Sequence, residues 1–197
     1  MKTKQIITTA IIAGITILSS CDKNDINPEQ PQNNNAQELI TTVIINGYNE
    51  SNPSLNQFSF KWEDLDGDGG NAPTIDTITL DTGITYMVNL LLLDKTKTPF
   101  DTISNEVIEE ANEHQLFYTL NAMLADRLSI EKLDFDTNNP ALPLGLQVRV
   151  KPTHTMQFTT PLIGSLNIVL SHYDGVAKTT SPSTESDIDI TIPVKLK

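Results

Sequence analysis

The sequence contains little material for a disulfide framework or a centre with many histidine ligands, because it has one cysteine and three histidines in 197 residues. A single cysteine excludes a disulfide within the chain. Basic residues are also scarce, since 13 Lys and Arg stand against 25 Asp and Glu, a formal net charge of −12. A field of this sign repels phosphate backbones, so nucleic acid is not an expected partner.

Motifs that carry catalysis are missing as well. The sequence has no G-x-S-x-G elbow, no phosphate-binding glycine loop, no dinucleotide-binding fingerprint and no C-x-x-C pair. Carboxylates are abundant, but no two of them are marked by the sequence as an acid/base couple. The sequence therefore predicts a protein that is not an enzyme.

The N-terminal apolar run, residues 6–18, is too short for a transmembrane helix, which needs about 20 apolar residues. It follows a cationic start and is typical of a secretory signal. Leu18-Ser19-Ser20-Cys21 comes next and resembles the bacterial lipoprotein signal, in which the cysteine is lipidated and becomes the new N-terminus. The resemblance implies a signal peptide over 1–20 and a membrane anchor on Cys21. The alternative is an ordinary signal peptide with an incidental cysteine.

Residues 21–37 are polar, contain proline and are rich in Asn and Gln, which predicts a flexible tether and places the folded domain at 38–197. Asp22 and Asp25, just behind the cysteine, resemble the surface-export signals of Bacteroidota lipoproteins. This implies a lipid anchor in the outer membrane, on its periplasmic or cell-surface face. In enteric bacteria an aspartate at this second position resembles an inner-membrane retention signal, so the leaflet stays open.

From Leu39 onward the apolar residues recur with a period of two. The pattern is clear over 58–62, over 144–151 and over 187–196, where isoleucines alternate with Asp187 and Asp189. Each run predicts a strand with one buried face and one solvent-exposed face. The nearly apolar run 86–93 predicts a central strand. About nine such runs with turn residues between them predict an all-β, antiparallel sandwich of the Ig-like or Greek-key kind, with one short helix or turn at 101–114.

An acidic glycine-rich loop follows the run 58–62. It offers four oxygen ligands for calcium, Asp64, Asp66, Asp68 and Asn71. The spacing resembles the first half of an EF-hand loop, but Ile75 stands where that loop needs a glutamate, so an EF-hand is excluded. A single calcium loop closed by other ligands is one hypothesis, and an acidic hairpin loop without an ion is the other.

A second set of candidate ligands joins the acidic segment to the histidines. A transition-metal site formed by His114 and His172 with one or both of Glu110 and Glu113 is chemically sensible. The alternative is a solvated acidic face with histidines at strand ends. A third segment, 134–139, either completes a calcium shell with the Asp64 loop or forms the turn before Pro140.

The leader, the tether, the segment FKWEDLDGDGGNAP and the pattern E-E-x-x-E-H-Q-x-F-Y together resemble a group of small Bacteroidota envelope lipoproteins. The resemblance implies a sandwich-like envelope protein, in some cases accompanying a TonB-dependent receptor of the outer membrane. The residues it marks are Asp64, Asp66, Asp68, Glu110, Glu113 and His114.

Two functions are consistent with these observations. The first is a ligand- or metal-binding accessory lipoprotein for an outer-membrane transporter. It is favoured because glutamates crowded beside a histidine repel one another unless a cation lies between them. The second is a structural or adhesive surface module in which calcium does no more than stiffen a loop.

Overall fold

The computed structural model describes residues 38–67, 69–153 and 160–197, all within one compact unit that spans 35–197. The predicted signal peptide, the Cys21 anchor and the tether lie outside the described residues, and so does Asp68 of the predicted calcium loop. The predicted domain 38–197 begins with the first of the described residues.

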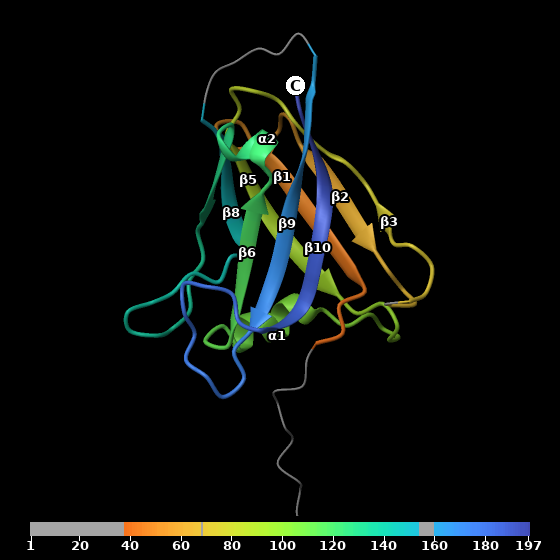
Figure 1. The fold of residues 1–197 in the computed structure, drawn as a ribbon, viewed down its shortest axis with the longest axis vertical. Coiled ribbons are helices and arrows are strands. Elements are labelled where there is room, and N and C mark those ends of the chain that lie inside the picture. Colours follow the sequence, from red (N-terminus) through yellow and green to blue (C-terminus); the bar gives the residue numbers. More distant parts are fainter. Residues whose placement is uncertain (1–37, 68, 154–159) are drawn as a thin grey trace, which may run out of the picture. The chain divides into compact units, whose positions relative to one another are not determined.

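The described strands form two sheets that face each other (Figure 1), which confirms the all-β sandwich. The larger sheet has the order β3-β2-β1-β5-β8-β7 and consists of β1 (Thr42–Asn49), β2 (Phe58–Glu63), β3 (Thr74–Ile75), β5 (Tyr86–Leu93), β7 (Leu128–Lys132) and β8 (Gln147–Pro152). The smaller sheet has the order β4-β10-β9-β6 and consists of β4 (Ile78–Leu80), β6 (His114–Leu120), β9 (Leu162–His172) and β10 (Glu185–Leu196). The pairing is antiparallel except between β4 and β10, which run parallel.

Two short helices accompany the sheets. α1 (Ile103–Glu109) lies where the sequence predicts a helix or turn, whereas the single turn α2 (Ala122–Ala125) is not predicted by the sequence. Figure 1 shows α1 across the end of the sandwich at which β6 begins and β9 ends. Among the described residues, no helix has the length and apolar content needed to cross a membrane.

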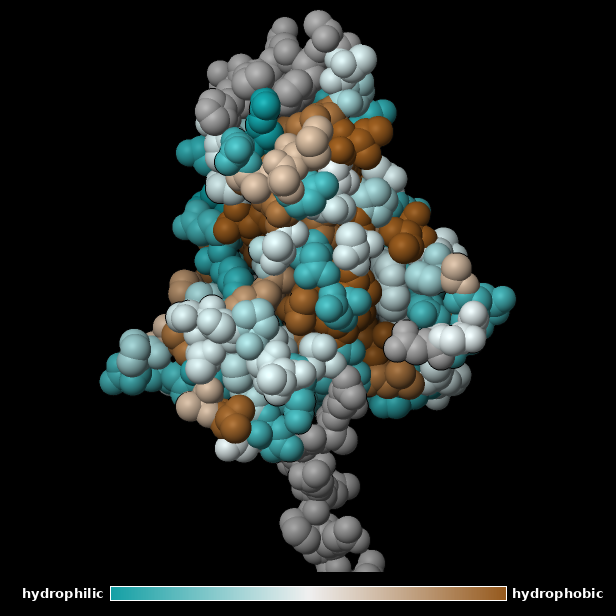
Figure 2. Space-filling model, viewed as in Figure 1, coloured by the Kyte–Doolittle hydropathy of each residue, from teal (hydrophilic) through white to brown (hydrophobic). Residues whose placement is uncertain are grey.

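The hydrophobic core lies between the sheets and follows the predicted alternation. On β10 the isoleucines at 188, 190 and 192 are buried, whereas Asp189 and Thr191 between them are exposed. β5 lies between β1 and β8, which confirms the predicted central strand. Figure 2 shows hydrophilic residues over much of one face of the molecule, with hydrophobic residues between them, as expected for strands that have one solvent-exposed face.

Gly145 precedes β8 in a buried and crowded position. Its φ is +101°, and a Cβ there would lie 3.0 Å from the Cβ of Leu116 and 3.2 Å from the backbone oxygen of Leu116. Gly145→Ala is expected to lower the free energy of unfolding by about 3 kcal/mol, because left-handed strain and overpacking add. Gly83→Ala is the matched control, since Gly83 has φ +80° but open space around its Cα. Urea unfolding of both variants measures this. An equal loss of unfolding free energy in the two variants would contradict the role of crowding at Gly145.

Candidate metal centre

Two histidines meet where β6 and β9 pair. His114 is the first residue of β6 and His172 the last of β9, and the antiparallel register places them directly opposite each other. Cross-strand neighbours on one face lie within side-chain contact. Their rings stack with centroids 4.5 Å apart and an interplanar angle of 26°. Both are buried, with 0% and 3% of their side chains exposed.

A carboxylate reaches the histidines through an irregularity in β10. The register of β10 against β9 shifts between Ser186 and Ile188, so Asp187 is an extra residue in the strand. A β-bulge of this kind redirects a side chain that the regular pleat would place on the other face. The predicted solvent-exposed position of Asp187 is therefore wrong, because its side chain is fully buried, whereas Asp189 is exposed as predicted.

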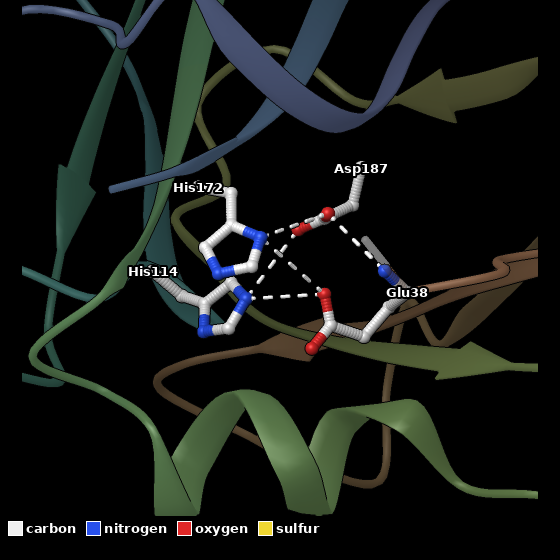
Figure 3. Close-up of side chains that lie close together, drawn as sticks. All are labelled: Glu38, His114, His172 and Asp187. Carbon is white, nitrogen blue, oxygen red and sulfur yellow. Dashed lines mark hydrogen bonds and ion pairs between the residues drawn. The ribbon is translucent and has the colours of Figure 1, made fainter. Parts of the chain in front are cut away.

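A second carboxylate comes from Glu38, which lies shortly before β1. Its backbone N–H donates to Oδ1 of Asp187 at 3.3 Å, and 6% of its side chain is exposed. Glu38, His114, His172 and Asp187 will be called the buried cluster. Figure 3 shows the two carboxylates turned toward one nitrogen of each imidazole. Among the described residues, this is the group of acidic and histidine side chains whose ligand atoms all lie within 4.8 Å of one another.

The spacing of these atoms matches a small tetrahedral metal site. His114 Nε2 lies 3.3 Å from Glu38 Oε2 and 3.4 Å from Asp187 Oδ2. His172 Nδ1 lies 3.4 Å from Asp187 Oδ1 and 3.9 Å from Glu38 Oε2. Ligands bonded to zinc at about 2.0–2.2 Å in a tetrahedron are about 3.3–3.6 Å apart. The four histidine-to-carboxylate distances lie in or near this range, and one ligand atom from each of the four residues lies within 4.8 Å of the others, so the buried cluster can hold one such ion once its side chains adjust.

When no metal ion is bound, a proton on His114 supplies the positive charge next to the two carboxyl groups. Burial lowers the pKa of His114, but hydrogen bonds and charges from Asp187 and Glu38 outweigh it and raise this pKa to about 10. Burial likewise raises the pKa of Glu38, and the hydrogen bond and charge of His114 hold it below its ordinary value. One imidazolium carries a single positive charge beside two carboxyl groups, those of Glu38 and Asp187. A divalent cation balances both, so the charge of the buried cluster favours it.

The outer contact of His114 suits metal binding, whereas His172 lacks such a contact among the described residues. His114 Nδ1 lies 3.2 Å from the backbone oxygen of Glu110, which can accept a hydrogen bond from Nδ1–H and so leave the lone pair of Nε2 free to bind an ion. His172 Nε2 is buried and has no hydrogen-bond partner among the described residues, and the same holds for one carboxylate oxygen each of Glu110 and Glu113. Burial, followed by the charge of Glu38, raises the pKa of Glu110, while both histidines act to lower it.

The predicted transition-metal residues therefore divide into two pairs. His114 and His172 come together as the hypothesis requires. Glu110 and Glu113 lie on the turn between α1 and β6 and are not part of the buried cluster. The carboxylates in the cluster are instead Glu38 and Asp187, which the sequence did not single out as ligands.

The predicted calcium loop is held by its own hydrogen bonds. Gly67 N donates to Asp64 Oδ1 at 2.9 Å, and the backbone and side-chain amides of Asn71 donate to Asp66 Oδ2 at 2.9 and 2.6 Å. These bonds hold the pKa of Asp66 below its ordinary value. They support the acidic turn without an ion, and calcium binding here stays a prediction.

The segment 134–139 has a structural role. Asp134 accepts hydrogen bonds from the backbone of Gly145 and Leu146 at 2.8 and 2.9 Å. Asp136 lies 3.1 Å from the ammonium of Lys178, and both side chains are fully buried. The carboxylates therefore hold the turn and a buried ion pair, and neither belongs to the buried cluster.

Comparison of the chain with protein-family models, curated proteins and solved structures gives no match.

Proposed function

We propose that this chain is a metal-binding module of the cell envelope that holds one divalent transition-metal ion, zinc by preference, in the buried cluster. The observation that carries the proposal is the distance of 3.3 to 3.9 Å from two imidazole nitrogens, one of each histidine, to carboxylate oxygens of Glu38 and Asp187. This mixed nitrogen and oxygen set suits zinc, whereas calcium and magnesium prefer oxygen ligands alone.

The cellular role in this proposal comes from the N-terminal sequence. The resemblance of residues 1–21 to a lipoprotein signal supports a lipid anchor on Cys21 and a place on the outer membrane. In that setting the chain is an accessory protein to a transporter of the outer membrane, such as a TonB-dependent receptor. Four protein ligands leave no open position on a tetrahedral ion, which supports binding rather than catalysis.

A second candidate is a structural or adhesive surface module in which the ion only stabilises the fold. The observation that favours it is the closure of the site, since buried four-ligand zinc sites are typically structural. The two candidates differ in metal exchange. If the chain is an accessory that transfers its ion, zinc should be released to a chelator within minutes. If the ion is structural, its release should take many hours.

Thermal unfolding of the purified chain with zinc and with EDTA tests the binding itself. Zinc at a hundredfold excess over Kd stabilises a folded state by about 2.7 kcal/mol. For a domain of this size we expect a rise of roughly 5–10 °C in Tm. Calcium at the same concentration is the control and should give a smaller rise. An unchanged Tm with zinc, together with no retained metal after gel filtration, would contradict the proposed function.

A further inference from the structure

An open groove lies beside the buried cluster and has a strongly acidic lining. Its volume is about 670 Å³, and its walls come from residues 38–41 before β1, the end of β2 with the loop after it, Thr96 after β5, and the first half of β10. Its five carboxylates are Glu38, Asp64, Asp66, Asp187 and Asp189, and no Lys, Arg or His is among the described residues that line it. We call it the acidic groove.

The acidic groove meets the buried cluster on its carboxylate side. Glu38 and Asp187 line the acidic groove, whereas the two histidines do not. Figure 3 shows the same order, with the carboxylates on one side and the stacked rings on the other. A cation that arrives through the acidic groove therefore meets oxygen ligands first and imidazole nitrogens last.

Asp187 lies at the inner end of the acidic groove, where a bound metal ion would replace the proton of His114. Asp187 Oδ2 is buried and accepts no well-aligned hydrogen bond, and the positive group beside it is the His114 imidazole, whose Nε2 lies 3.4 Å away. A buried carboxylate oxygen without a donor costs free energy unless a cation approaches it. Asp66 and Asp189, which also line the acidic groove, are exposed to solvent.

We infer that the acidic groove is the path by which the metal ion enters the buried cluster, and that Asp64, Asp66 and Asp189 speed its capture by attracting the hydrated cation. The inference rests on the proposed function. Clefts lined by charge of one sign concentrate counter-ions and raise association rates. The attraction is long-range and doubled for a divalent ion, so it acts before any ligand bond forms.

The rate of zinc capture by the full chain tests this inference. The variant is Asp66→Asn with Asp189→Asn, and the matched control is Glu109→Gln with Asp126→Asn, two exposed acids outside the groove lining. Both variants change the net charge by the same amount. At low salt we expect the groove variant to bind zinc roughly tenfold more slowly than the control, with a dissociation rate unchanged within about twofold. At high salt the difference should vanish because the charges are screened.

Three outcomes would count against the inference or its premise. Equal association rates in the two variants at low salt would overturn the groove as the entry path. A faster dissociation with unchanged association would make Asp66 and Asp189 ligands or structural residues instead. A wild-type chain that captures no zinc at any salt concentration would overturn the proposed function itself, which is a separate result.

Discussion

Zinc affinity is expected to fall more than about a hundredfold when Asp187 is replaced by asparagine. Residues that only orient a metal ligand cost 10–100-fold in affinity when they are removed, so loss of a charged ligand should exceed that range. Asn keeps the volume of Asp but removes a negative charge that the cation balances. Its amide N–H₂ also cannot bind a cation if it faces the ion. His172→Ala is expected to act in the same direction, because it removes an imidazole ligand.

The measurement is a competitive zinc titration against a chelator of known affinity, with Asp126→Asn as the control. Asp126 is exposed and lies outside the buried cluster, so this control should bind within a few-fold of the wild type. Melting of Asp187→Asn in EDTA shows whether the metal-free domain still folds. A folded Asp187→Asn chain that binds zinc as tightly as the wild type would remove Asp187 from the site.

The second large effect is expected at the buried pair of Lys178 and Asp136. Asp136→Asn should lower the free energy of unfolding by about 3–5 kcal/mol, because it leaves a buried ammonium without its countercharge. Lys178 Nζ lies 3.1 Å from Asp136 Oδ2 and donates to the backbone oxygen of Ala111 at 2.9 Å. In the variant the hydrogen bond to Ala111 remains, but the ion pair with residue 136 is lost. The corresponding fall in Tm is roughly 10 °C or more.

Asp101→Asn is the matched control, since Asp101 pairs with Lys97 at 2.6 Å on the surface. Exposed pairs contribute about 0–1 kcal/mol, so this variant should melt close to the wild type. Acid provides a second readout. Burial raises the pKa of Asp136, but hydrogen bonds from Leu142, Asn138 and Lys178 and the lysine charge hold it below its ordinary 3.8. Its stabilisation is therefore present above pH 3.8 and is lost as the pH falls below that. A similar loss of unfolding free energy in Asp136→Asn and Asp101→Asn would contradict the role of burial.

The strands were predictable because alternation is a local property of the sequence. The runs that predict β2, β5 and β10 correspond to observed strands, and the apolar stretch 86–93 correctly indicates an interior strand. α2 was missed because a four-residue turn of helix, Ala122–Ala125, has no periodic signal of its own. The parallel pairing of β4 with β10 was missed because pairing between distant strands leaves no local mark.

The metal site was only half predictable. His114 and His172 attract notice because histidines are scarce and each lies at the end of an apolar run. Their meeting depends on the register between β6 and β9, which the sequence does not display. Asp187 looks like an ordinary exposed residue of an alternating strand until the bulge turns it inward. Glu38 lies next to a polar segment, and only the tertiary structure brings it to residues far along the chain.

X-ray absorption at the zinc edge of the full chain, loaded with one equivalent of zinc, tests the central claim most directly. The account predicts four nitrogen or oxygen ligands at about 2.0–2.2 Å and the outer-shell scattering of two imidazoles. The imidazole signal should halve in His172→Ala. Six oxygen ligands without imidazole scattering, or a spectrum that His172→Ala leaves unchanged, would contradict a metal centre built from Glu38, His114, His172 and Asp187.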